Sequence, residues 1–102
     1  MDLQEVAVLK RFEYKVPGGK LLRVKVEDRD GRISFLQITG DFFLLPETDL
    51  EMLENKLIGY PLDAGKIVDA VTGFFAERKT TIAGASPADF AYVINSALGI
   101  RA

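Results

Sequence analysis

The 102-residue sequence contains no cysteine and no histidine. Without cysteine the chain has no disulfide bond, no thiol nucleophile and no thiolate ligand for zinc. Without histidine it also lacks serine–histidine and cysteine–histidine catalytic pairs and the usual zinc sites. Much of catalytic chemistry, including the usual zinc-dependent kinds, is therefore excluded.

Long apolar runs and an excess of positive charge are also missing. The longest stretch without a charged residue covers residues 90–100, which is too short to cross a bilayer. No basic segment followed by an apolar run marks a signal peptide. The 13 basic and 15 acidic residues argue against nucleic acid as the main partner, because phosphate binding needs a basic surface. We expect a cytoplasmic protein that binds neither nucleic acid nor membrane.

The first forty residues have the hydrophobic period of β-strands. Apolar and polar residues alternate in three runs, at residues 6–16, 20–28 and 32–40. Turn segments that contain glycine separate the runs, as in β-hairpins. The third run is apolar on both sides, which predicts a central or doubly covered strand. The three runs predict a three-stranded antiparallel meander.

From Pro46 onward the hydrophobic period changes to 3.6 residues, which predicts three helices. Thr48 followed by Glu51 predicts a capping box at the start of the first helix. Ser86 followed by Asp89 predicts a capped start for the third.

The second helix is expected to begin near Asp63. Gly73 inside this helix costs up to about 1 kcal/mol relative to alanine, and close packing against another backbone would explain it. The pattern predicts an α+β two-layer sandwich, in which the meander is followed by three helices on one face. We expect residues 1–102 to form a single domain.

Four acidic residues, Glu47, Asp49, Glu51 and Glu54, lie beside the start of the first predicted helix. Carboxylates in such a group can perform acid–base chemistry. They are also favoured at helix starts by the helix dipole. We interpret them as helix-stabilising residues and assign no catalytic, cofactor-binding or metal-binding residue.

Positive charge is concentrated in residues 10–25, where Glu13 is the only acidic residue. One interpretation is a solvated strand face, and the other is a docking surface for an acidic partner. Residues 40–46 offer a second candidate, because two aromatic residues and two leucines precede a proline there. These side chains fill the core, or they are presented to a partner. The candidate partner-interface residues are Arg11, Lys15, Arg23, Lys25, Gly40, Asp41, Phe42, Phe43 and Pro46.

Several short segments resemble the C-terminal accessory domain of bacterial lipoate–protein ligases and, more closely, its free-standing archaeal counterpart, the small ligase subunit. They are Pro17-Gly18-Gly19-Lys20-Leu21, Gly31-Arg32-Ile33, Ile38-Thr39-Gly40-Asp41-Phe42-Phe43 with Pro46, Leu57-Ile58-Gly59, and Ser86-Pro87 with Asp89-Phe90. They follow the order of the family from about residue 12 to residue 98. The run from Gly40 to Phe43 is the most specific of them.

The resemblance implies an accessory role. Ligases of this family use ATP to convert lipoate to lipoyl-adenylate and then transfer the lipoyl group to a lysine of an acceptor domain. Their glycine-rich substrate segment and catalytic lysine lie in the large domain, and nothing in this sequence matches them. The resemblance thus implies no enzyme activity and no cofactor for this chain alone, with ATP and lipoate used by the complex. The expected partners are the catalytic large subunit and, indirectly, the lipoyl-acceptor domain.

The family fold looks like that of sulfur-transfer scaffold proteins, but the absence of cysteine excludes their chemistry. Only about ten residues precede the family pattern, which favours a separate small subunit over an excised domain. Two other classes remain open. One is a stand-alone interaction or scaffold module without a ligase partner, and the other is a small enzyme that uses carboxylates.

Overall fold

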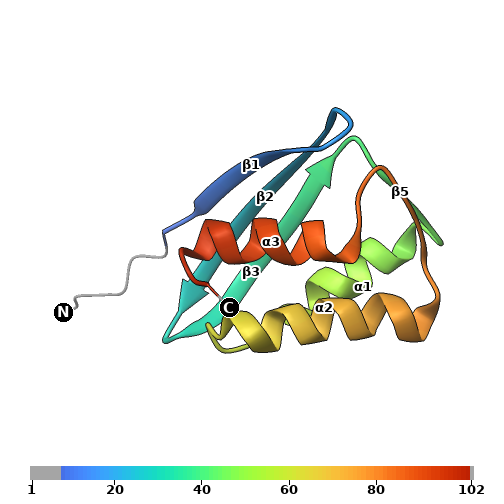
Figure 1. Ribbon diagram of the computed structural model, residues 1–102. Coiled ribbons are helices and arrows are strands. Elements are labelled where there is room, and N and C mark those ends of the chain that lie inside the picture. The colour runs from blue at the N-terminus through green and yellow to red at the C-terminus, as the bar shows by residue number, and fades with distance from the viewer. Residues whose placement is uncertain (1–7, 102) are drawn as a thin grey trace.

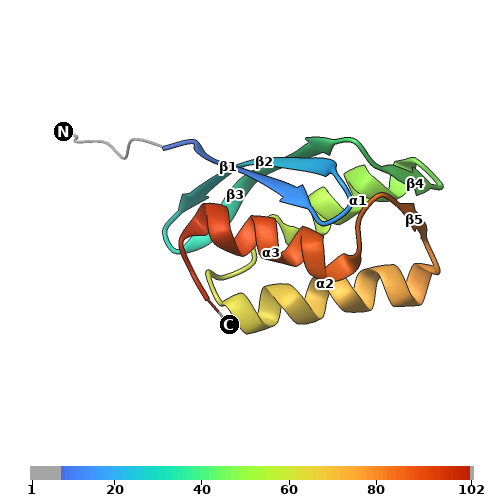
Figure 2. The same ribbon diagram turned by 45° about the horizontal axis from the view of Figure 1, so that its top comes forward.

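The computed structural model describes residues 8–101. Its elements in chain order are β1 (Lys10–Val16), β2 (Lys20–Arg29), β3 (Arg32–Gly40), β4 (Phe43–Leu45), α1 (Thr48–Leu57), α2 (Ala64–Arg78), β5 (Thr81–Ala83) and α3 (Pro87–Leu98). β1, β2 and β3 form an antiparallel sheet in that order, and the three helices lie on one side of it (Figure 1, Figure 2). The predicted α+β fold is confirmed. The first predicted strand began at residue 6, and residues 6 and 7 lie outside the described part.

The two hairpin turns have the chemistry that their sequences predict. Asp30 and Gly31 have φ angles of 54° and 75°, as a two-residue turn of type I′ requires. Between β1 and β2, Gly18 and Gly19 also have positive φ angles, and the Gly19 N–H donates to the Val16 carbonyl at 2.9 Å. These turns explain why each strand folds back directly on the preceding one.

β3 is an edge strand, so the prediction of a central or doubly covered strand is wrong. β2 occupies the centre of the sheet. Ile33 and Phe35 pair with consecutive residues of β2, which leaves Ser34 as the extra residue of a β-bulge. The bulge lets both Ile33 and Leu36 point into the core, whereas Phe35 is 40% exposed. The strand therefore looks apolar on both sides in sequence, although only one side is covered.

The outer edge of β3 is covered by α1 and by the segment that follows it. The Ile33 N–H donates to the Tyr60 carbonyl at 2.9 Å, and the Gly59 N–H donates to the Ile33 carbonyl at 2.7 Å. Further along the strand, the Ile38 N–H donates to Oε2 of Glu54 at 2.8 Å. These hydrogen bonds satisfy backbone groups that an open edge would offer to another chain.

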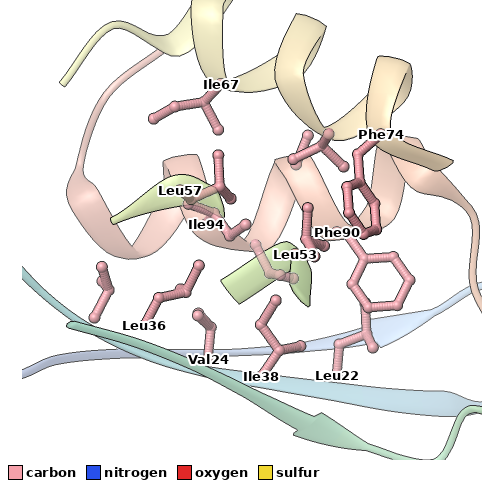
Figure 3. Close-up of a cluster of buried hydrophobic side chains, with 14 of the residues drawn as sticks. Leu22, Val24, Leu36, Ile38, Leu53, Leu57, Ile67, Phe74, Phe90 and Ile94 are labelled. Carbon is pink, nitrogen blue, oxygen red and sulfur yellow. The ribbon is translucent and has the colours of Figure 1, made fainter. Parts of the chain in front are cut away.

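The hydrophobic core lies between the sheet and two tiers of helices. α1 and α3 contact the sheet, and α2 packs against both of them. Figure 3 shows the side chains of the sheet at the bottom, those of α1 and α3 in the middle and those of α2 at the top. Phe90 is fully buried, and its ring contacts those of Phe42 and Phe75 at centroid distances of 5.1 and 5.3 Å. Burying one such side chain stabilises the fold by about 1.5–3 kcal/mol.

Two predicted helix starts are confirmed. At the start of α2, the Asp63 side chain accepts a hydrogen bond from the Lys66 N–H at 3.1 Å. At the start of α3, Ser86 and Asp89 form the reciprocal capping box that their spacing predicts. Both side chains satisfy amide groups that have no partner within the helix.

The capping box predicted from Thr48 and Glu51 is wrong. Glu47, which precedes α1, already has helical angles (φ −59°, ψ −33°), and no side chain caps this helix. A capping residue needs extended backbone angles. Instead, a tight turn leads into α1, and the Asp49 N–H donates to the Pro46 carbonyl at 3.1 Å.

The expectation that Gly73 packs closely against another backbone is also wrong. A Cβ atom added at Gly73 would meet no atom within 4 Å, apart from its own helix backbone and chain neighbours. The residue lies on an exposed part of α2. Packing within the described chain therefore does not explain why a glycine, which costs the helix free energy relative to alanine, stands at this position.

Candidate functional site

The face of the sheet opposite the helices carries the basic residues of the candidate interface. Arg11 and Lys15 on β1, and Arg23 and Lys25 on β2, are all exposed. Alternate residues of a strand point to the same side, so the structure brings these four cations onto one surface. We call this surface the open face of the sheet.

Strand register arranges the side chains of the open face in rows. Arg11 pairs with Lys25, and Lys25 pairs with Gln37. In the next row Glu13 pairs with Arg23, whose Nε donates to Glu13 Oε2 at 3.1 Å. The Arg23 charge is thus balanced within the sheet, whereas Arg11 and Lys25 place like charges directly opposite each other.

Sequence reasoning missed a second element, the short ribbon that β4 forms with β5. Phe43 pairs with Ala83 and Leu45 pairs with Thr81, and all four residues are exposed. Leu44 points the other way and is buried. Phe43 is 72% exposed and Leu45 is 60% exposed, so the outer surface of the ribbon is largely apolar. We call Phe43, Leu45, Thr81 and Ala83 the ribbon face.

The two adjacent phenylalanines have different environments. Phe42 packs edge-to-face against Phe90, with ring planes at 89°, and it contributes to the core. Phe43 is presented to solvent. Both interpretations of the aromatic segment therefore apply, each to one of the two rings.

The ribbon face continues the open face along the chain. Between Leu36 and Leu45, Leu36, Ile38 and Leu44 are buried and Phe42 is half-buried, whereas the residues between them are exposed. The alternation keeps its phase from the end of β3 into β4. In Figures 1 and 2 the ribbon lies at the end of the sheet where β3 ends. The outward side of this stretch is therefore polar on the sheet and apolar on the ribbon.

Of the other candidate interface residues, Gly40 has a clear backbone role. Its φ angle is 148°, and a Cβ atom there would collide with the Leu21 carbonyl oxygen. The next residue, Asp41, donates its N–H to the same carbonyl at 2.8 Å. Asp41 and Pro46 are exposed on either side of the ribbon strand. Gly40 thus lets the chain leave the sheet close to β2, whereas the other two residues are accessible.

A buried carboxylate fixes the base of the ribbon. Asp49 is fully buried and accepts hydrogen bonds from Arg78 Nε at 2.9 Å and from Thr80 Oγ1 at 2.5 Å. These two bonds, first that of Arg78, hold the pKa of Asp49 below its ordinary value although burial opposes them. Asp49 follows β4 within α1, and Thr80 directly precedes β5. The carboxylate therefore ties together the segments that flank the ribbon.

Glu54 also departs from the predicted helix-stabilising role. Its pKa is raised, chiefly because burial disfavours the charged form, whereas the hydrogen bond from the Ile38 N–H lowers it and the nearby Glu51 raises it. Asp49 thus fixes the base of the ribbon, and Glu54 accepts a hydrogen bond from the edge strand of the sheet. Asp49 lies in the first turn of α1 and Glu54 in its second half, and only Asp49 is fully buried. In sequence both look like exposed helix acids, so no signal marked either role.

A hollow of about 730 Å³ lies between β1, α2 and α3, and no carboxylate is among its lining residues. Within residues 8–101, no group of three or more aspartate, glutamate, cysteine or histidine residues could hold a metal ion. In the same part of the chain, no helix is both long and apolar enough to span a membrane. Among the described residues, the candidate interface residues on the open face and on the ribbon face are the exposed groups that the sequence had singled out.

The family to which this small α+β domain belongs is shown by its sequence. The family described as the bacterial lipoate protein ligase C-terminus matches residues 10–94, from the start of β1 into α3. The chain belongs to this family. The resemblance seen in the sequence is therefore confirmed, and the relationship supports an accessory role.

A relative of known sequence and a solved structure, both archaeal, are similar to this chain. It is 36% identical over 70 residues to lipoate-protein ligase A subunit 2 of Thermoplasma acidophilum, and the match covers 69% of this chain and 71% of the relative. It also resembles a chain in the structure of an archaeal lipoylation system, a bi-partite lipoate protein ligase and its E2 lipoyl domain from the same organism. That likeness has a TM-score of 0.69 at 29% identity and covers 87% of this chain and 94% of the other.

Proposed function

We propose that this chain is the non-catalytic accessory subunit of an ATP-dependent lipoate–protein ligase in the cytoplasm. It docks on the catalytic subunit and supports the formation of lipoyl-adenylate, and hence protein lipoylation. Family membership and the likeness to a ligase subunit 2 support this proposal. The catalytic subunit binds ATP and lipoate, and this chain meets the lipoyl-acceptor domain only through it.

The observation that carries the proposal is the apolar ribbon face. Phe43 and Leu45 are two of the most exposed large hydrophobic residues in residues 8–101, and they point outward from the same strand. Neither contributes to the core. Aromatic residues near the centre of an interface typically cost about 2 kcal/mol or more when truncated. A ring held on a fixed ribbon loses little conformational freedom on binding, which favours its use as an anchor.

The open face extends the proposed contact beyond the ribbon. Charges at the rim of an interface mainly change the association rate and its dependence on salt. We therefore assign the anchoring contact to Phe43 and the steering of association to the cations of β1 and β2. No catalytic residue is assigned to this chain.

The test measures lipoate-dependent ATP–pyrophosphate exchange by the catalytic subunit with and without this chain. We expect exchange to increase when the chain is added and none from the chain alone. Phe43→Ala should weaken binding about thirtyfold at all salt concentrations, without changing the free energy of unfolding by more than about 0.5 kcal/mol.

Met52→Ala is the matched control, because Met52 is an exposed apolar side chain on α1. It should bind normally. Exchange by the purified chain alone, or no effect of the chain on the catalytic subunit, contradicts the proposed function. Normal binding by Phe43→Ala would instead move the anchor away from the ribbon.

A further inference from the structure

Within the described part of the chain, the open face contains cations that form no ion pair or side-chain hydrogen bond. Lys10 is paired with Asp28 at 2.9 Å and Arg23 with Glu13 at 3.1 Å. Within residues 8–101, Arg11, Lys15 and Lys25 have no hydrogen-bonded or ionic side-chain partner. Arg11 and Lys25 are direct cross-strand neighbours, a placement that destabilises a sheet when the charges are alike.

Two ordinary explanations do not account for this pair. Charged side chains protect edge strands from pairing with other chains, which explains Arg11 on β1 but not Lys25 on the central strand β2. Solubility is served equally well by charges of both signs, as in the neighbouring Glu13–Arg23 row. The opposed cations thus cost the free chain stability without a benefit that the free chain itself explains.

We infer that the row Arg11–Lys25–Gln37 is a binding site for a cluster of carboxylates on the surface of the catalytic subunit. The inference rests on the proposed function and adds the chemistry of the contact. The occupant follows from charge complementarity, because an acidic group between Arg11 and Lys25 relieves their repulsion. The whole chain has net charge −2, so a polyanion such as nucleic acid is disfavoured, whereas a local acidic protein patch is not.

The geometry of the row fits such a partner. The three residues lie on three adjacent strands, which are about 4.8 Å apart, so donor groups are presented across about 10 Å. The Arg11 guanidinium can hold a carboxylate through two parallel hydrogen bonds, Lys25 supplies a point charge, and the Gln37 amide supplies a further donor. Lys15 extends the positive surface along β1. The positive surface ends at Glu27, a half-buried acidic residue that pairs with Phe35.

The test compares Arg11→Ser/Lys25→Ser with the matched control Lys56→Ser/Lys66→Ser, which removes two exposed cations from α1 and α2. The melting temperature of each free chain and its affinity for the purified catalytic subunit are measured, the latter at 50 and 500 mM NaCl. We expect the first variant to melt higher than the wild type, since the repulsion is removed. Its affinity should fall about tenfold at 50 mM and approach the wild-type value at 500 mM. The control should bind as the wild type does.

A variant that is more stable yet binds more weakly is a result that a purely structural role would not produce. Unchanged affinity and salt dependence of Arg11→Ser/Lys25→Ser would overturn the site while leaving the proposed function intact. An unchanged or lower melting temperature would overturn the repulsion argument, whether or not the catalytic subunit binds. Binding of the wild type to duplex DNA or to vesicles of anionic lipid at 150 mM NaCl would assign the row to a different partner. Failure of the wild type to bind the catalytic subunit would refute the proposed function itself.

Discussion

The two sides of the sheet differ in how far the stability of the fold explains which residues they carry. On the helix side, Val24, Ile38 and their neighbours are buried, and α1 and α3 cover them completely. On the open side, Arg11 and Lys25 place like charges opposite each other on paired strands, and the adjoining ribbon presents Phe43 to solvent. Burial of the apolar side chains on the covered side stabilises the domain, whereas Phe43 beside the open side lies outside the core.

This difference indicates where to look for functional residues in this domain. For a core residue, burial and contacts are enough to account for which amino acid stands at the position. Residues that violate local rules without a compensating contact are expected at functional sites. The open face and the ribbon face carry such residues, and the predictions below test whether the division holds.

The largest effect is expected from Phe90→Ala on the covered side. Phe90 is fully buried and packs against the rings of Phe42 and Phe75. Its truncation should cost about 3–5 kcal/mol, through lost transfer free energy and an unfilled cavity. Urea unfolding followed by circular dichroism measures this cost.

The matched substitution on the open side is Phe43→Ala, which changes the same side chain at a position that is 72% exposed. It should leave the urea midpoint almost unchanged. If Phe90→Ala fails to fold, Phe90→Leu provides a milder measurement at the same position. Similar losses at Phe43 and Phe90 would break the comparison, because the ribbon would then be part of the core.

The meander and the helices could be predicted because their signals are local. Hydrophobic period, the Asp30-Gly31 turn and the Ser86–Asp89 capping box act within a few residues and are confirmed. The two errors have different causes. The bulge at Ser34 depends on pairing with β2. The start of α1 depends on a local turn after Pro46, which already gives Glu47 helical angles.

The second prediction concerns Asp49, which joins the two sides at the base of the ribbon. Its folded-state pKa is lowered by Arg78 and Thr80, so the ionised carboxylate stabilises the fold at pH values above its ordinary pKa of about 3.9. This stability should be lost as the pH falls through the lower pKa of the folded state. Asp49→Asn should be less stable than the wild type at pH 7, and the difference should shrink below about pH 4.

Thermal unfolding of both proteins between pH 7 and pH 2 provides the measurement. The ribbon should respond as well, because Asp49 ties the segments on either side of β4 and β5. Hydrogen exchange of the Leu44 and Ile82 amides should become faster in Asp49→Asn at pH 7. Parallel stability curves for the two proteins across this range would show that Asp49 does not act through its charge.

The residues of the candidate site could be predicted better than the backbone arrangement that brings them together. Basic residues at alternate positions of β1 and β2 indicated an exposed face, and the aromatic segment indicated either core packing or presentation to a partner. The partner strand β5 begins 36 residues after the end of β4. Its three residues are too short a run to predict a strand or its pairing from the sequence. Gly84, where a Cβ atom would lie 2.8 Å from the Asp41 carbonyl oxygen, became meaningful only once the ribbon was seen.

The smallest effect is expected from Gly73→Ala, on the helix side and far from the open face. Gly73 lies within α2, and a Cβ atom there would meet no atom within 4 Å outside its own helix backbone and chain neighbours. Alanine should stabilise the chain by about 0.5–1 kcal/mol, because it restricts the unfolded backbone and favours the helix. Urea unfolding measures the gain, and titration against the catalytic subunit measures binding. Unchanged affinity is expected if docking uses the open face and the ribbon face. A stabilised variant that binds the catalytic subunit more weakly would place part of the contact on α2, where a side chain at Gly73 would obstruct it, and the division between the two sides would fail.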